Sequence, residues 1–102
     1  MEINAHNFGK TAVFELEGRF VFESHKSLRT ACEPAIANDT TACIQLEMSQ
    51  VEYLDSAALG MLLLMKEKAG KAGKVVQIKG ARGIALQVLQ VARFDQIFEI
   101  AN

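Results

Sequence analysis

Hydrophobic and polar residues alternate in several short stretches of the chain, a pattern typical of half-buried β-strands. One strand is predicted over Thr11–Gly18, and residues 1–8 can pair with it through a tight turn. Further strands are predicted over Thr41–Met48 and over residues 74–80, whereas residues 49–55 interrupt the alternation. The pattern therefore predicts four strands, of which the first two form a hairpin.

A helical period replaces the alternation in residues 22–39, where apolar side chains recur at every fourth position. Ser24 is a candidate N-cap, and Asn38 with Asp39 is expected to end the helix. Pro34 lacks a backbone N–H, so we expect it to kink or split this helix. The repeating apolar residues are Leu28, Cys32 and Ile36.

Two more helices are predicted in the second half of the chain. The first covers residues 56–69, after which Gly70 and Gly73 are suitable stop residues. The second covers residues 81–94, and residues 94–102 form a short last element of open type. One side of the later helix carries Ile84, Val88 and Val91.

Strands that alternate with helices predict an α/β fold, because parallel strands need crossover connections. The first hairpin adds an antiparallel edge, so we expect a mixed sheet of four or five strands flanked by helices. A chain of 102 residues is near the common size of one domain, and we expect residues 1–102 to form a single domain.

Composition and charge exclude several classes of function. The 11 basic and 12 acidic residues give a net charge of −1, so nothing favours a nucleic-acid partner. The N-terminus lacks the pattern of a signal peptide, and the longest apolar run, Met61–Met65, is far too short to insert into a membrane. We therefore expect a cytoplasmic protein in which Cys32 and Cys43, without a CxxC pattern, are reduced and buried thiols.

One face of the helix over residues 56–69 is small, low in relief and partly apolar. At about 100° per residue, six side chains fall on this face. Such a face can receive another protein, although a single exposed leucine is also ordinary on a soluble protein. The residues are Ser56, Ala57, Gly60, Met61, Leu64 and Lys68.

Ser56 has two interpretations from its position. Either Asp55 or Ser56 is a suitable N-cap, which would make the serine purely structural. Alternatively, Ser56 accepts a phosphoryl group, since a helix N-terminus stabilises added negative charge. A phosphate of about −1.5 to −2 charge next to Asp55 would expel a partner packed on the neighbouring apolar face.

The segment from residue 46 to residue 80 closely resembles the STAS-domain anti-sigma factor antagonists. Their hallmark is a strand ending in L-x-L/M-S/T, then V-x-Y/F-L/I-D-S-S/A-G/A-L-G and an apolar helix. The sequence LEGRF at Leu16–Phe20 is also similar to the family's second strand and following loop. The hallmark positions are filled by Leu46, Met48, Ser49, Val51 and residues Tyr53 to Gly60.

This resemblance implies a STAS fold and a partner-switching mechanism. The unphosphorylated protein would bind a serine-kinase anti-sigma factor, and the kinase would phosphorylate Ser56, directly after Asp55. A PP2C-type phosphatase, or a receiver–phosphatase regulator, would restore it. The protein would be a substrate and ligand rather than an enzyme, with no catalytic residue, metal or cofactor of its own. The implied partner surface adds the loop residues Phe22, Glu23, Ser24 and His25 to Asp55 and the helix face.

The chain departs from the family pattern at a few positions. Ala57 and Ala58 stand where many members have a serine and a glycine, which leaves Ser56 as the one acceptor in the motif. Val21 stands where members often carry an aspartate in the loop facing the partner, and Glu23 is the nearest acidic residue.

Other functions are weaker predictions. Ser56 lacks the GxSxG elbow of hydrolases, and His6 and His25 have no visible acidic orienter. The two cysteines and two histidines show no metal-ligand spacing. The main alternative within the fold is a STAS accessory subunit of an ABC lipid-transport system, which would hold an ATPase without being phosphorylated.

Overall fold

The computed structural model describes residues 1–101 and contains a mixed sheet of five strands in the order β1-β2-β3-β4-β5. β1 pairs antiparallel with β2, and the other pairs are parallel, which confirms the predicted fold class and hairpin. The strands are β1 (Glu2–Phe8), β2 (Thr11–Phe20), β3 (Cys43–Leu54), β4 (Val75–Lys79) and β5 (Glu99–Ala101). The helices are α1 (His25–Ala37), α2 (Ser56–Lys71) and α3 (Gly83–Val91), with short 3-10 turns η1 (Phe22–Ser24) and η2 (Phe94–Gln96).

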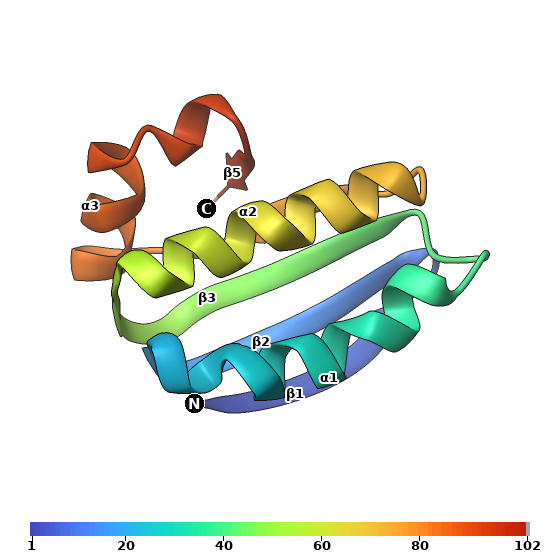
Figure 1. Ribbon diagram of the computed structural model, residues 1–102, viewed down its shortest axis with the longest axis horizontal. Helices are drawn as coiled ribbons and strands as arrows, with labels where there is room; N and C mark the ends of the chain where they lie inside the picture. The colour runs from blue at the N-terminus through green and yellow to red at the C-terminus, as the bar shows by residue number, and fades with distance from the viewer. Residues whose placement is uncertain (102) are drawn as a thin grey trace.

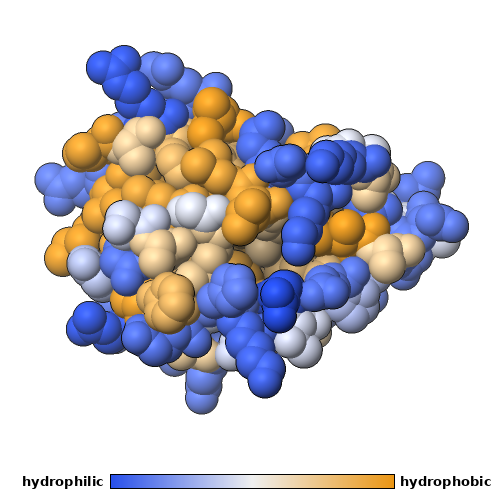
Figure 2. Space-filling model, viewed as in Figure 1, coloured by the Kyte–Doolittle hydropathy of each residue, from blue (hydrophilic) through white to orange (hydrophobic). Residues whose placement is uncertain are grey.

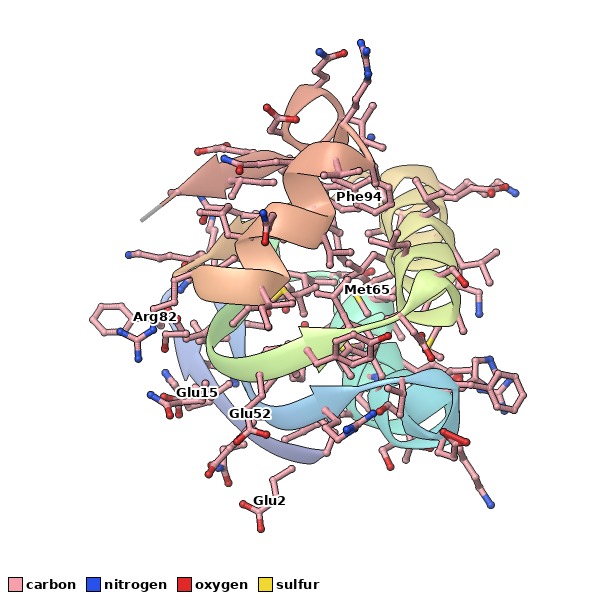
Figure 3. The ribbon with its side chains drawn as sticks, turned by 90° about the vertical axis from the view of Figure 1, so that its left-hand side faces the viewer. Glu2, Glu15, Glu52, Met65, Arg82 and Phe94 are labelled. Carbon is pink, nitrogen blue, oxygen red and sulfur yellow. The ribbon has the colours of Figure 1, made fainter. Side chains whose placement is uncertain are left out.

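The helices α1 and α2 lie across the same face of the sheet (Figure 1), and this face carries the core. Alternate residues of β2, β3 and β4 point into it, including Phe14, Leu46 and Ile78, each at most 3% exposed. Figure 3 shows Met65 of α2 on this side, whereas Glu15 projects from the opposite face of the sheet. The polar alternate of each strand therefore faces away from α1 and α2, as period-two patterning requires.

β3 is longer than the alternation predicts, because it continues beyond Met48 to Leu54. Its buried positions are two residues apart up to Met48, and they then change phase at Val51 and Leu54. The pairing with β2 is irregular over the same stretch, with register shifts between Glu15 and Glu17 and again after Gly18. The interruption expected after Met48 is therefore a bulged part of one strand, since a bulge moves side chains to the other face.

α1 is one continuous helix through Pro34. The proline was expected to kink or split the helix, and the predicted split is wrong. Ser24 occupies the N-cap position, but its side chain makes no capping hydrogen bond to the helix. α3 ends at Val91 rather than at residue 94, because Arg93 adopts a left-handed conformation with φ of 61°.

The apolar side predicted for the helix over residues 81–94 is largely its outer side. Ile84 and Val91 are 57% and 81% exposed, whereas Ala85 and Leu89 are fully buried. Leu86 and Val88 are partly buried against the core, so of the predicted apolar side only Ile84 and Val91 lie outside. Residues 94–102, for which the sequence did not indicate a type of element, contain η2 and the edge strand β5. Asn102 lies outside the described residues.

A buried lysine that the sequence did not single out joins three elements. Lys74, 8% exposed, precedes β4. Its Nζ donates hydrogen bonds to the carbonyl oxygens of Asn38 (2.8 Å) and Thr41 (2.9 Å). These bonds satisfy the buried ammonium and tie the end of α1 to the starts of β3 and β4.

Gly80, immediately after β4, has a conformation that other residues rarely adopt. Its φ is +75°, and a Cβ at this position would collide with the Glu47 carboxylate, which accepts a hydrogen bond from the Ser49 N–H at 3.1 Å. Arg82 Nε donates to the Ser49 carbonyl oxygen at 3.2 Å, so the same strand segment also orients the start of α3.

We expect Gly80→Ala to lower the free energy of unfolding by at least about 1 to 2 kcal/mol, the usual cost of left-handed backbone for a residue with a Cβ. Gly70→Ala is the matched control, because Gly70 is helical and a Cβ there meets nothing within 4 Å. Urea denaturation of both variants measures the difference. Equal stability of the two variants would contradict the role given to Gly80.

The two thiols are free but differ in burial, so the prediction of two buried cysteines holds only for Cys32. Burial raises the pKa of Cys32 to about 12. The pKa of the half-buried Cys43 is raised by burial and then by the charge of Glu99. Both thiols are therefore protonated and poorly nucleophilic near neutral pH.

We expect an alkylating reagent at about pH 8 to modify Cys43 before Cys32, because thiolate and access are both scarcer at Cys32. Mass spectrometry of digests taken over time measures the two rates. The same reaction in urea is the control, in which the two rates should converge. Faster modification of Cys32 in the folded protein would contradict this account.

Candidate functional site

The start of α2 is organised by Asp55, the residue between β3 and the helix. Its backbone is extended, and its Oδ1 accepts a hydrogen bond from the Ala58 N–H at 2.9 Å. This is the geometry of an N-cap, which satisfies a donor that the first turn leaves free. Asp55, rather than Ser56, is therefore the cap, and one of the two interpretations of Ser56 loses its basis.

The same carboxylate also holds the loop between β2 and α1. Asp55 Oδ2 accepts from the Phe22 N–H at 3.3 Å, and the Asp55 N–H donates to the Phe20 carbonyl oxygen at 3.3 Å. The loop and the helix N-terminus, which are more than thirty residues apart, are thereby joined. The Asp55 carboxylate thus fixes the relative position of the two segments that the sequence assigned to one surface.

Ser56 is the first residue of α2, and its side chain is exposed. Its hydroxyl lies beside the free N–H groups of the helix start, where the helix dipole stabilises negative charge. Asp55 is half-buried beside it, so any negative group added to Ser56 would also meet the Asp55 charge.

Most of the predicted partner surface is exposed around Ser56. Phe22 is 67% exposed and Leu64 is 54% exposed, which is high for large apolar side chains. Figure 2 shows hydrophobic residues gathered over α3 and the first half of α2. This patch lies at the end of the molecule at which α2 begins. The remaining exposed or half-exposed members are Glu23, His25, Ala57, Gly60 and Lys68.

Two predicted members of this surface are buried, and their placement is corrected. Met61 is only 8% exposed, because it turns toward the seam between α1 and α2. Ser24 is 4% exposed, and its Oγ accepts from the Val21 N–H and donates to the Arg19 carbonyl oxygen, both at 3.2 Å. Ser24 therefore closes the loop in which Val21 stands, and does not face outward.

A shallow groove with a volume of about 50 Å³ runs between α1 and α2 beside this surface. Its floor is apolar, and Met61 and Cys32 belong to it. His25 and Lys68, both exposed, lie at its rim. The groove continues the partly apolar character of the α2 surface toward α1.

The described residues offer little for other chemistry. Within residues 1–101 no three His, Cys, Asp or Glu side chains come together in a way that would hold a metal ion. Over the same residues, none of the helices combines the length and apolarity needed to cross a bilayer. His6 does have an acidic neighbour, with its Nδ1 at 3.7 Å from Glu15 Oε1, but the pair lies on the face of the sheet away from α1 and α2.

Residues 4–100 match a family model described as Mlab, STAS domain. The chain belongs to the STAS domain family. A STAS-domain containing protein of Pseudomonas aeruginosa is 30% identical over 93 residues, which cover 91% of this chain and 90% of that protein. The family expected from the motif around Ser56 is thus confirmed at the level of the STAS domain.

Solved structures of anti-sigma factor antagonists share this fold. An anti-sigma factor antagonist of Mycobacterium paratuberculosis superimposes with a TM-score of 0.84 at 23% identity, covering 98% of this chain and 84% of that one. SpoIIAA from Bacillus in its phosphorylated form gives a TM-score of 0.74 at 15% identity, covering 99% and 92%. SpoIIAA has also been solved unphosphorylated, with a TM-score of 0.74 at 13% identity, covering 99% and 87%.

We expect Asp55→Ala to reduce the free energy of unfolding by about 1 to 2 kcal/mol, since it removes an N-cap and a link to the loop. Ser56→Ala should change it by less than about 0.5 kcal/mol, because Ser56 is exposed and does not cap the helix. Chemical denaturation measures both variants. A larger loss for Ser56→Ala than for Asp55→Ala would reverse the assignment of the cap.

Proposed function

We propose that this protein is a cytoplasmic anti-sigma factor antagonist whose partner binding is switched by phosphorylation of Ser56. The observation that carries the proposal is that Asp55, and not Ser56, caps the start of α2. Asp55 supplies the cap, which leaves the exposed Ser56 hydroxyl free for chemistry. The unphosphorylated protein binds a serine-kinase anti-sigma factor through the loop and the α2 surface and thereby withdraws it from its sigma factor.

Phosphoryl transfer requires nothing catalytic from this chain. The Ser56 Oγ attacks the terminal phosphorus of ATP held by the kinase, ADP leaves, and the hydroxyl proton passes to a base of the kinase. The phosphatase, of PP2C type or joined to a receiver domain, adds water to the phosphoserine and releases inorganic phosphate. ATP and metal ions belong to those enzymes, and this chain is their substrate.

The surroundings of Ser56 support an electrostatic switch. A phosphate adds about −1.5 to −2 charge, which the helix N-terminus tolerates, so the fold survives. The charge stands beside the Asp55 carboxylate, at one end of the surface that also carries the exposed side chains of Phe22 and Leu64. Packing an apolar partner there would desolvate a dianion, which is far more costly than desolvating a hydroxyl.

The binding test uses tagged protein as bait in lysate of the native host. We expect Ser56→Ala to retain an anti-sigma factor with an ATP-binding kinase domain, and Ser56→Asp to lose it by at least about tenfold, or ~1.4 kcal/mol. Mass spectrometry of the retained proteins identifies and quantifies the partner.

Ser27 provides the matched control, because it is an exposed serine in the first turn of α1. Ser27→Ala and Ser27→Asp should both bind as the native protein does. Equal capture of a transporter ATPase by Ser56→Ala and Ser56→Asp would refute the switch. That result would favour the accessory subunit of an ABC lipid-transport system.

A further inference from the structure

The two edges of the sheet differ in what they offer to another chain. β5 is an edge of only three residues, whereas β1 is an edge of seven residues. Natural edge strands are usually blunted by proline, lysine, a bulge or shortness. β1 contains neither proline nor lysine, and its seven pairs with β2 run without a register shift. β1 is thus a long, regular edge without the usual protection.

The hairpin turn determines which backbone groups of β1 remain free. Gly9, with φ of +61°, is the first of two turn residues, so Phe8 and Thr11 form the hydrogen-bonded pair that closes the hairpin. Hydrogen-bonded and non-bonded pairs alternate along an antiparallel ladder. The N–H and C=O groups directed away from β2 are therefore those of Ile3, Ala5 and Asn7.

The side chains of β1 are complementary to those of a second, antiparallel β1. With Asn4 on a twofold axis, Glu2 of one copy lies opposite His6 of the other, on the face away from the helices. On the helix side the same register sets Ile3 opposite Ala5. The His6 ring can donate a hydrogen bond to the Glu2 carboxylate opposite it, and no like charges face each other, which is an arrangement that stabilises strand pairs.

The helix side of this edge also offers apolar contact. Ala31 lines two hollows between β1 and α1, one shared with Ile3 and the other with Ala5. A neighbouring Ile3 or Ala5 from a second copy would extend this apolar strip, beside Lys26, which lines the hollow at Ile3. Figure 1 shows α1 between β1 and α2, so such pairing leaves the surface around Ser56 open.

We propose that β1 is a dimerisation edge, at which a second copy of this chain adds its own β1 in antiparallel orientation to form one continuous sheet. Pairing through Ile3, Ala5 and Asn7 satisfies the backbone groups that this edge leaves free. The dimer presents two Ser56 surfaces to partners. The proposal does not depend on the function assigned to Ser56.

Sedimentation equilibrium tests the dimer directly, at loading concentrations of about 10 µM and about 1 mM, the range of weak to moderate affinities. We expect the mass of the native chain to rise toward twice that of the monomer. Asn4→Lys should remain monomeric, because lysines would face each other at the edge. Gln87→Lys adds the same charge on the exposed side of α3 and should dimerise as the native chain does.

Amide hydrogen exchange of the native chain shows where the copies meet, with no variant required. The Ile3, Ala5 and Asn7 amides should exchange at least about tenfold more slowly at the high concentration. The Asn4 and His6 amides, already paired to β2, should not change. A monomer at both concentrations, a dimer unaffected by Asn4→Lys, or protection elsewhere in place of these three amides would each overturn the proposal.

Discussion

The Asp55 carboxylate is the interaction on which the arrangement of the site depends. One oxygen caps α2 through the Ala58 N–H, and the other holds the Phe22 N–H of the loop after β2. The backbone of Asp55 adds a third link, to the Phe20 carbonyl oxygen. Because a single group makes these contacts, the helix start and the loop behave as one surface, and Ser56 is left without a capping role.

This arrangement gives physical meaning to the order of the aspartate and the serine. The cap must be buried enough to hold its two donors, and it is half-buried, whereas the following residue points into solvent. If the capping residue itself were the phosphorylated one, its modification would break the hydrogen bonds that position the helix. In the proposed switch, phosphorylation one residue later would leave those bonds intact and change only the surface, so the folded protein would pass repeatedly between two binding states.

Much of the fold was predictable from local patterns. Period-two segments identified β2 and β4 and the first part of β3, and the period of four residues identified α1, because one face of each is buried in the core. The end of β3 was not predictable in this way, since its bulged register with β2 changes which residues face the core. Such a shift depends on the neighbouring strand and leaves no period in the sequence.

The placement of the candidate site residues was predictable where a motif positions them, and less so where packing determines which of them are exposed. The aspartate–serine pair marked the start of α2, but either residue matched a cap until the bond to Ala58 was seen. An ideal helical wheel put Met61 on the exposed face, yet it lies in the floor of the groove between α1 and α2. Ser24 looked like an exposed cap, yet its hydroxyl bonds within the loop, and Lys74 gave no sign of its buried role.

The most direct measurement is the intact mass of the native protein and of Ser56→Ala, each purified from the native host with and without phosphatase treatment. The account predicts a fraction of the native protein heavier by one phosphoryl group. That fraction should disappear on phosphatase treatment and be absent from Ser56→Ala. A native protein that is unmodified in every growth condition, or a phosphoryl group that persists in Ser56→Ala, would contradict the central claim that Ser56 is the switch.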